Sequence, residues 1–307
     1  MRTERFKRVL LSVLMVAALI TLAIPLSQVS SISATPDGLV PHDPILIEGN
    51  DNFIPANGVS SGSGMLGDPY VIEGWDIEPK IKLSHGLVGL SGIQIIDTDA
   101  CFIIRNRKVH DGKAENLSGI TFYNVKNGKI EKMIIDSNFI GIRLQGQHSE
   151  NNIIENCVVK NNGMGILLLM ASNNVIRNCI VRNNNNSIEL APWIPTGMAG
   201  PLPMLSDNNR VYHNDFVNNE NQAFDGGSNY WDNGSEGNYW SDYTGEDINN
   251  DGIGDTPYII PRDNNQDRYP LMSPFVEKQP PEPVRWLLIA VIVAIIGIAF
   301  IFYMKRR

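Results

Sequence analysis

The sequence contains a near-duplication of twelve residues: NNIIENCVVKNN begins at Asn151, and NNVIRNCIVRNN begins at Asn173. Apolar and polar residues alternate inside both copies, which is the period of a half-buried β-strand. The copies start only 22 residues apart (151 and 173). A unit this short cannot bury its apolar face alone, so neighbouring units have to stack. The duplication therefore predicts a solenoid of parallel strands with one coil per unit.

Weaker signals extend this repeat over residues 92–224. A small residue followed by an apolar one recurs at spacings of 27, 22, 24, 22 and 36 residues; the pairs are Gly92-Ile93, Gly119-Ile120, Gly141-Ile142, Gly165-Ile166, Ser187-Ile188 and Ala223-Phe224. The last spacing is long because a Pro- and Gly-rich insertion at 191–205 interrupts the repeat. We therefore expect an all-β fold, a right-handed parallel β-helix of about seven coils.

The alternation also predicts which apolar side chains point into the solenoid. Inward residues of one coil should stack on those of the next coil. We expect Ile154, Val158, Ile166 and Leu168 in one coil to stack on Ile176, Ile180 and Ile188 in the next.

Asparagine is a poor strand residue, and yet it recurs at fixed places in the repeat. The positions are Asn156, Asn178 and Asn214 and, five residues further on, Asn161, Asn183 and Asn219. A corner between strands often requires positive φ, which asparagine tolerates. Because equivalent corners of stacked strands lie about 4.8 Å apart, their amides can also donate to one another. The pattern predicts asparagine ladders along the corners.

Cys157 and Cys179 occupy equivalent positions in the two copies, so they should lie on top of each other. Stacked strands bring the two Cα atoms near the lower limit for a disulfide. An in-register ladder of thiols, a strained disulfide and a metal or redox pair all remain open. Cys101 has no obvious partner, and three cysteines do not make a disulfide framework.

Both ends of the chain combine an apolar run with basic residues. Basic residues precede the apolar run 9–26, which predicts a secretory signal at 1–34 cleaved after Ala34, or else an uncleaved anchor. Residues 286–304 carry no charge and would span roughly 28 Å as a helix. We expect a single-pass transmembrane helix at 285–304 in the cell membrane. The β-helix domain would lie outside the cell or in the periplasm, and the basic tail 305–307 in the cytoplasm.

The part between these ends is acidic. We divide it into an N-terminal cap with the first coils (35–90), the repeats (91–228), a C-terminal cap (229–273) and a Pro-rich stalk (274–284). Of 25 Lys and Arg and 33 Asp and Glu, the two ends hold eight basic residues and one acidic residue, which leaves 17 and 32, a net charge of −15. This charge disfavours nucleic acid and anionic lipid headgroups as partners. It is compatible with cations and with neutral sugars.

The copies NNIIENCVVKNNGMGILLL and NNVIRNCIVRNN, with the terminal GNYWSDYTGEDINNDGIGDTPYII and DRYPLM, resemble the NosD-type right-handed parallel β-helix proteins over roughly residues 45–272. This family belongs to the wider group of carbohydrate-binding and sugar-hydrolase (CASH) domains, of which membrane-anchored versions are frequent in archaea. The resemblance implies a periplasmic or surface β-helix. It ties the namesake branch to maturation of the copper enzyme nitrous oxide reductase, and the wider group to polysaccharides.

Copper is implied by this resemblance alone. Copper sites need imidazole or sulfur ligands. The histidines are scattered without paired spacing, at His42, His85, His110, His148 and His213. Met198 and Met204 share the insertion, but packing is the better default for them.

Calcium has a more specific signal in the C-terminal cap. In DINNDGIGD (247–255), Asp247, Asn249, Asp251 and Asp255 fall at positions one, three, five and nine of an EF-hand-like loop, with Gly252 at the turn. Position twelve is Tyr258 instead of the usual glutamate. A structural calcium site and a metal-free turn of Asx residues and glycine both fit this sequence.

Candidate catalytic and ligand-binding residues are few. Asp97 and Asp99 lie two apart in a strand-like run, so both carboxylates should point to one face, as a glycosidase or lyase would need. Trp193 lies in the insertion, away from any evident core, and is the first candidate for stacking on a sugar. Trp231 and Trp240 are weaker candidates, since packing in the cap is the role we favour for them.

We therefore expect a surface module that binds carbohydrate or a cell-envelope polymer without catalysis. Three alternatives stay open: a polysaccharide lyase or hydrolase, an accessory factor that handles copper, and a structural spacer.

Overall fold

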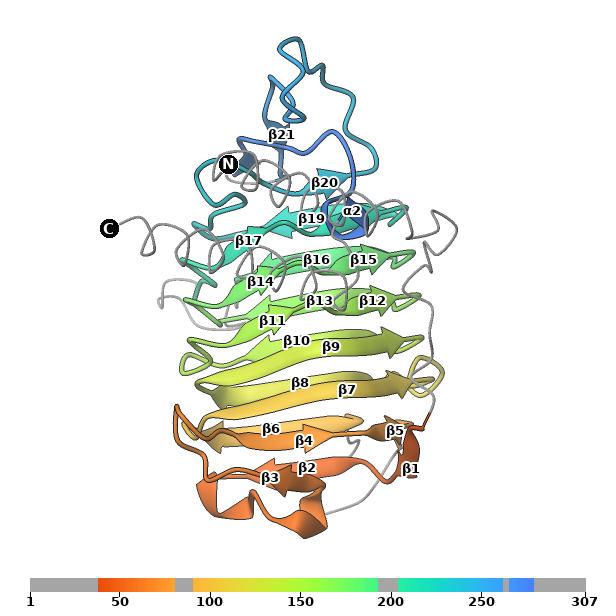
Figure 1. Ribbon diagram of the computed structural model, residues 1–307, viewed down its shortest axis with the longest axis vertical. Helices are drawn as coiled ribbons and strands as arrows, with labels where there is room; N and C mark the ends of the chain where they lie inside the picture. Colours follow the sequence, from red (N-terminus) through yellow and green to blue (C-terminus); the bar gives the residue numbers. More distant parts are fainter. Residues whose placement is uncertain (1–37, 81–90, 193–203, 262–264, 279–307) are drawn as a thin grey trace, which may run out of the picture. The chain divides into compact units, whose positions relative to one another are not determined.

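The computed structural model describes residues 38–80, 91–192, 204–261 and 265–278 (Figure 1). The predicted signal, the predicted transmembrane segment and Trp193 lie outside these residues. Within them, no helix is long and apolar enough to cross a membrane. The regular secondary structure of the described chain consists of β-strands and of three short helices, η1 (Asn50–Asn52), η2 (Pro55–Asn57) and α2 (Phe275–Lys278).

A seven-stranded parallel sheet supplies one strand to each successive coil. Its strands are β2 (Ile45–Glu48), β6 (Ile93–Thr98), β8 (Ser118–Val125), β10 (Ile140–Gln145), β13 (Met164–Leu169), β16 (Asn186–Ala191) and β19 (Asn221–Asp225). The expected coils are therefore present, with equivalent residues in register; Ile142, for example, pairs with Ile120 on one side and Ile166 on the other.

A larger, thirteen-stranded sheet closes the other sides of the coils. Its strands are β1 (Val40–His42), β3 (Val59–Ser61), β4 (Tyr70–Glu73), β5 (Trp75–Ile77), β7 (Phe102–His110), β9 (Gly128–Asp136), β11 (Ile153–Glu155), β12 (Val158–Lys160), β14 (Val175–Arg177), β15 (Ile180–Arg182), β17 (Arg210–Tyr212), β18 (Asp215–Val217) and β20 (Tyr239–Trp240). The pairings are parallel except for the β3–β4 hairpin at the N-terminal end. A separate antiparallel pair, β21 (Tyr258–Ile259) and β22 (Gln266–Asp267), belongs to the C-terminal cap.

The corners of the coils are residues with left-handed backbone. Asn156 and Asn161 have φ of 54° and 58°, and Asn178 and Asn183 have φ of 54° and 55°. The expectation that these asparagines turn corners is therefore confirmed. After the corner at Asn156 the inward alternation restarts, so that Cys157 and Val159 point inward and Val158 points outward.

This restart corrects part of the predicted core. Val159 and Val181 are completely buried in the continuous core, whereas their neighbours Val158, which is buried at 7% exposure, and Ile180, which is half-buried, are not part of that core. The other predicted inward residues are buried in one continuous core: Ile154, Ile166, Leu168, Ile176 and Ile188. Cys157 and Cys179 are buried free thiols one coil apart, as their equivalent positions predicted.

The asparagine ladders run mostly through other asparagines than those we predicted; of the six predicted positions, only Asn214 and Asn219 are ladder members. Asn152 donates its side-chain amide to Asn174 at 3.0 Å, Asn174 donates to Asn209 at 3.1 Å, and Asn209 donates to Asn229 at 3.0 Å. A second ladder joins Asn138, Asn162, Asn184 and Asn219 in the same direction. The residue at each corner supplies the left-handed backbone, and the buried residue that follows it supplies the ladder amide.

The copy after the insertion is also shifted by one residue from our alignment. Asn214, which we aligned with Asn178, is equivalent to Cys179, and its Oδ1 accepts the N–H of Cys179 at 3.0 Å. His213 turns the corner instead, with φ of 57°. Likewise Ala223, not Phe224, pairs with Ile188. Aligning the copies by their asparagines fails here because a histidine occupies the corner.

Each ladder ends on an acceptor at the C-terminal end of the solenoid, because every ladder asparagine donates toward that end. Asn229 donates to Asp225 at 2.7 Å, and Asn219 donates to Gln222 at 2.9 Å; both acceptors belong to β19. A third, short ladder runs from Asn214 through Asn238 to Asp267 in the cap. The last strand of the repeats and the cap together satisfy the last amides of the solenoid.

Candidate functional site

On the outer face of the larger sheet, acidic and basic side chains form ion pairs with one another. Lys129 lies 2.6 Å from Glu131 and 2.7 Å from Glu155, and Arg177 lies 2.7 Å from Glu155. Burial alone would raise the pKa of Glu155, but hydrogen bonds from Lys129 and Arg177 lower it. Arg105 bonds Glu73 in the same way at 2.7 Å. Since these charges are already paired across the coils, this face offers few free groups to a ligand.

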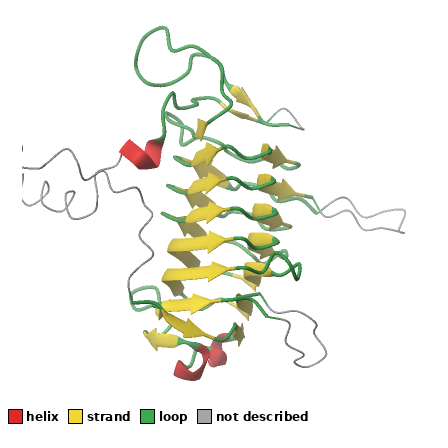
Figure 2. Cartoon of the chain, turned by 90° about the vertical axis from the view of Figure 1, so that its right-hand side faces the viewer, coloured by secondary structure: helices red, strands yellow, loops and turns green. Residues whose placement is uncertain are grey.

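Polar groups gather instead on the turns that follow the strands of the seven-stranded sheet. We call these turns, together with the strand-end corners at 97 and 124, the turn edge. The turns are residues 49–52, 99–101, 126–127, 146–152, 170–174, 204–209 and 226–230. Figure 2 shows the coils from the side, with the loops stacked beside the strands. Left-handed asparagines line this edge coil after coil, at Asn127, Asn151, Asn173 and Asn208. Two depressions open on it.

The N-terminal depression is formed by the coils of β2, β6, β8 and β10 and has a volume of about 540 Å³. Its lining consists of Asn50, Asp51, Asp97, Thr98, Asp99, Asn124, Lys126 and His148. Both predicted catalytic residues, Asp97 and Asp99, are exposed and lie in this depression.

Amide donors fix the two carboxylates in place. Asn124 donates to Asp97 at 3.0 Å, and Asn50 donates to Asp99 at 2.8 Å. Asn50 is itself oriented, because its Oδ1 accepts the hydroxyl of Thr98 at 2.6 Å. Asp97 turns a corner with φ of 50°. The depression therefore presents ordered carboxylates beside an imidazole and an ammonium group, which can accept and donate hydrogen bonds to hydroxyls and exchange protons.

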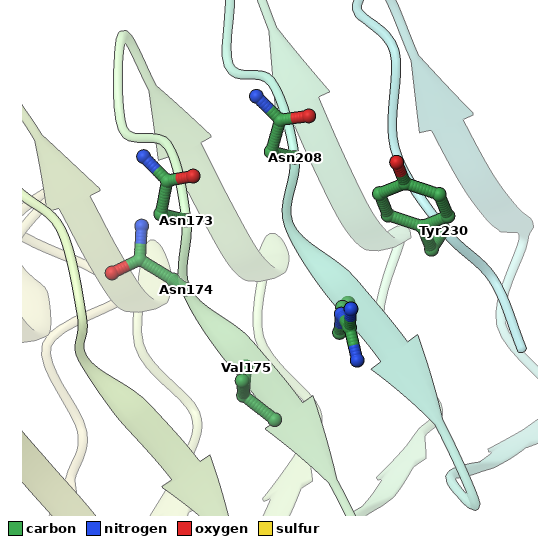
Figure 3. A pocket seen from close by; sticks show the side chains of 6 residues that line it. Asn173, Asn174, Val175, Asn208 and Tyr230 are labelled. Atoms are coloured by element: carbon green, nitrogen blue, oxygen red, sulfur yellow. The ribbon is translucent and has the colours of Figure 1, made fainter. Parts of the chain in front are cut away.

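The C-terminal depression is formed by the coils of β14 and β17 and by the turn after β19, and it has a volume of about 330 Å³. It is lined by Asn173, Asn174, Val175, Asn208, Arg210 and Tyr230 (Figure 3). Asn173 and Asn208 turn equivalent corners of successive coils, with φ of 59° and 58°, and both side chains are exposed. In Figure 3 their amides follow one another along the edge, with the ring of Tyr230 beyond them.

An aromatic ring and a guanidinium group complete this depression. Tyr230 is 51% exposed, and the guanidinium carbon of Arg210 lies over its ring at 5.7 Å from the centroid. Beneath them, the buried amides of Asn174 and Asn209 tie the coils together. The surface thus combines a flat apolar ring with planar hydrogen-bonding groups on a rigid base.

The family of the chain follows from a match to a family model. The model for the right handed beta helix region matches residues 52–194 and 91–242. The chain belongs to the right-handed β-helix family. This agrees with the parallel sheets and the coil-by-coil register of the fold.

Individual relatives share smaller parts of this β-helix. Over 108 residues the chain is 36% identical to the probable ABC transporter binding protein NosD of Stutzerimonas stutzeri, which is 33% of this chain and 24% of that protein. The chain thus spans about a quarter of the length of this curated relative.

Two solved structures share the fold distantly. One is a tailspike protein of the Acinetobacter baumannii bacteriophage Fri1, a capsular polysaccharide depolymerase, at 11% identity and a TM-score of 0.32, covering 62% of this chain and 42% of that one. The other is the A-module of the Azotobacter vinelandii mannuronan C-5 epimerase AlgE6, at 12% identity and a TM-score of 0.26, covering 62% and 64%.

Two of the predicted ligand-binding residues belong to the core of the cap. Trp231 and Trp240 are each only 1% exposed. Their indole N–H groups donate to the buried carboxylates that end the ladders: Trp231 to Asp225 at 2.8 Å and Trp240 to Asp267 at 2.9 Å. The weaker prediction that these tryptophans contact a ligand is wrong, because both rings are buried and both N–H groups already donate to carboxylates, and the favoured packing role is confirmed.

The 247–255 loop is closed by bonds from its own backbone. Asp247 accepts the N–H groups of Asp251 at 3.1 Å and of Gly252 at 2.9 Å, and Asn249 accepts the same N–H of Asp251 at 3.0 Å. Asp255 accepts the N–H of Ile248 at 2.6 Å. Oxygens of Asp247 and Asn249 therefore lie close together around one N–H group, and Gly252 has the positive φ expected at the turn, 87°.

Across the described ranges, no three His, Cys, Asp or Glu side chains lie close enough together to hold a metal ion. The fit of the 247–255 loop to calcium depends on amide and backbone oxygens as well as on carboxylates.

Our sequence analysis missed most of the residues that line the two depressions. Arg210 and Tyr230 form a bridge between adjacent coils, so the segments NNRVY and SNYWD are equivalent. Aligning these segments could have identified Tyr230 as the next member of the turn edge. Asn50, Lys126 and His148 carry no comparable signal, since only the stacking of separate coils brings them together.

Proposed function

We propose that this chain is a binding protein for carbohydrate and that a polysaccharide of the cell envelope lies along its turn edge. The observation that carries the proposal is the C-terminal depression, where the exposed ring of Tyr230 lies beside the amides of Asn173 and Asn208. A pyranose has an apolar C–H face that stacks on an aromatic ring. Its equatorial hydroxyls pair well with planar amides, which donate and accept at once.

The spacing of the edge favours a polymer over a single sugar. Equivalent side chains repeat at the distance between stacked strands, about 4.8 Å, which is comparable with the length of one pyranose unit. Both depressions lie on the same edge, so a chain running parallel to the stack would meet one and then the other. The buried ladder under the corners keeps the backbone that carries the exposed amides in register, so little conformational freedom of the backbone is lost on binding.

We further propose that the protein acts at a cell surface, held by the predicted transmembrane segment at 285–304. This proposal rests on the sequence of that segment, which lies outside the described residues.

The proposal is tested with the full-length chain in detergent micelles, titrated with soluble polysaccharides and followed by calorimetry or affinity electrophoresis. We expect binding to at least one polymer and a loss of about tenfold or more in affinity for Tyr230→Ala. The control is Phe139→Ala, because Phe139 is a similarly exposed ring, 45%, in the turn before β10 on another side of the coils. Equal affinities of the two variants would place the ligand elsewhere.

A second function, cleavage of such a polymer, is favoured by the N-terminal depression. Asp51, Asp97 and Asp99 line this depression together with His148 and with Lys126, which pairs with Glu150 at 2.7 Å. Glycosidic cleavage needs a proton donor and a proton acceptor in one site. Release of reducing ends or unsaturated products by the full-length chain measures this activity. We expect any activity to fall at least about a hundredfold in Asp97→Asn and Asp99→Asn. The exposed Asp68→Asn is the control, and activity that survives in the first two variants would exclude this site.

A further inference from the structure

The two depressions of the turn edge carry opposite charges. Three aspartates line the N-terminal one, whereas no acidic residue lines the C-terminal one. Arg210 is the only charged residue in its lining. This arrangement stands out because the part of the chain between its two ends carries a net charge of −15.

Arg210 differs from Arg177, on the adjacent strand, in having no carboxylate partner. In the preceding coil, Arg177 is held by Glu155 at 2.7 Å and donates to the hydroxyl of Tyr212 at 3.2 Å. Among the residues that the structure describes, no acidic side chain forms an ion pair with Arg210. Asp207, the nearest acid along the chain, accepts the backbone N–H of Ser228 at 2.7 Å.

The guanidinium group of Arg210 is exposed and lies beside an aromatic ring. Its carbon is over the ring of Tyr230, at 5.7 Å from the centroid, which is the distance of a cation–π contact. Such a contact uses no N–H group of the guanidinium, so these groups stay available to a ligand. This rim fits the two oxygens of a carboxylate or sulfate group, and such charge-assisted pairs are stronger than neutral hydrogen bonds.

We propose that the C-terminal depression selects an acidic sugar residue of the bound polymer. The carboxylate of a uronate, or a sulfate ester, would take the rim of Arg210. The ring of the sugar would lie on Tyr230, and its hydroxyls would bond Asn173 and Asn208. This inference rests on the proposed function and narrows the class of ligand to acidic polysaccharides, because a polymer without acidic groups would form no ion pair with Arg210.

The test compares polymers that differ only in charge. The full-length chain in detergent micelles is titrated with polygalacturonate and with its methyl ester, which keeps the backbone and removes the charge. Dextran sulfate and dextran form the second pair. We expect the charged member of at least one pair to bind about tenfold to a hundredfold more tightly than its neutral partner, and affinity to fall as salt is raised.

Variants assign the preference to Arg210. We expect Arg210→Ala to remove the difference between the charged and neutral polymers and Arg210→Lys to keep part of it, since lysine retains the charge and loses the planar fork. Lys113→Ala removes an equal charge from an exposed turn outside the turn edge and should change nothing. Selectivity for the carboxylate pair would identify a uronate, and selectivity for the sulfate pair a sulfate ester.

Two results would overturn the inference, and they differ from failure of the proposed function. If charged and neutral polymers bind equally well, or if Arg210→Ala keeps the preference, the depression does not recognise the acidic group. The proposed binding of carbohydrate would still hold in that case. If no polysaccharide binds at all, the proposed function fails, and this inference fails with it.

Discussion

The backbone N–H of Asn238 donates to Oδ2 of Asp267 at 2.7 Å, and with this bond an asparagine ladder ends on a carboxylate. Trp240 donates to the same oxygen at 2.9 Å, and the N–H of Tyr269 donates to the other oxygen at 3.1 Å. A carboxylate accepts on both oxygens and so satisfies donors that arrive from several sides, which an amide cannot do. The cost of this arrangement is a fully buried negative charge.

Burial raises the pKa of Asp267 to about 6, against the opposing effect of its donors. Between about pH 4 and pH 6 the folded chain therefore binds a proton that the unfolded chain has lost. From this group alone the free energy of unfolding should fall by about 3 kcal/mol as the pH rises through that window. Denaturant melts of the wild type and Asp267→Asn at several pH values check this prediction. A difference between the two proteins that stays constant with pH, or that grows in favour of the wild type, would contradict it.

Asn174 and its neighbour Asn173 should respond very differently to substitution. The side-chain amide of Asn174 is buried, donates to Ser149 at 3.0 Å and to Asn209 at 3.1 Å, and accepts from Asn152. We expect Asn174→Ala to lower the free energy of unfolding by about 3 kcal/mol, because several buried groups lose a partner at once. Asn173→Gly keeps the left-handed corner and should change it by less than about 0.5 kcal/mol. Equal costs in chemical denaturation would show that the ladder does not hold the coils.

Arg107 is a buried cation whose removal should not harm the fold. It is completely buried, burial lowers its pKa to about 8 against the effect of Glu73, and one of its terminal nitrogens has no hydrogen-bond partner. The equivalent residue of the next coil is Met133. We expect Arg107→Met to raise the free energy of unfolding by about 1 kcal/mol, because an apolar side chain of similar length avoids the cost of burying the charge. A loss of stability in urea melts would mean that the bond from Arg107 to the carbonyl of Ile72 outweighs this cost.

Calcium separates the two interpretations of the 247–255 loop. Asp247 and Asn249 already direct oxygens to one N–H group, and we expect Ca²⁺ to bind these oxygens and raise the Tm. At a hundredfold excess over Kd the gain should be about 3 kcal/mol. Asp247→Asn should abolish the calcium effect, and Asp68→Asn should preserve it. If neither Ca²⁺ nor a chelator changes the Tm, the loop is a turn stabilised by its Asx residues alone.

Most of the fold could be predicted from the sequence because its determinants are local and repeated. Alternation gives the strands, and residues such as Asn156 and Asn178 mark the corners by tolerating positive φ. The errors arose where a corner changes which side chains point inward, as at Val158, and where His213 replaces a corner asparagine. An alignment by residue type cannot detect such a shift, whereas the register of the strands does.

The candidate site could be predicted only in part. Asp97 and Asp99 were identified because both lie in one short run, and they do share a depression. Tyr230 and Arg210 were not, since the insertion and the cap separate them from the regular repeat in the sequence. Trp240 was kept as a weak ligand candidate because a tryptophan at a ligand surface and one in a cap core look alike in sequence; its 1% exposure in the structure distinguishes them.

The most direct test of the whole account is the affinity of the full-length chain for a soluble polysaccharide, measured for the wild type, Tyr230→Ala and Phe139→Ala under identical conditions. We expect the wild type and Phe139→Ala to bind the polysaccharide, and we expect Tyr230→Ala to lose about tenfold or more in affinity. Absence of polysaccharide binding by the wild type, or equal binding by all three proteins, would contradict it.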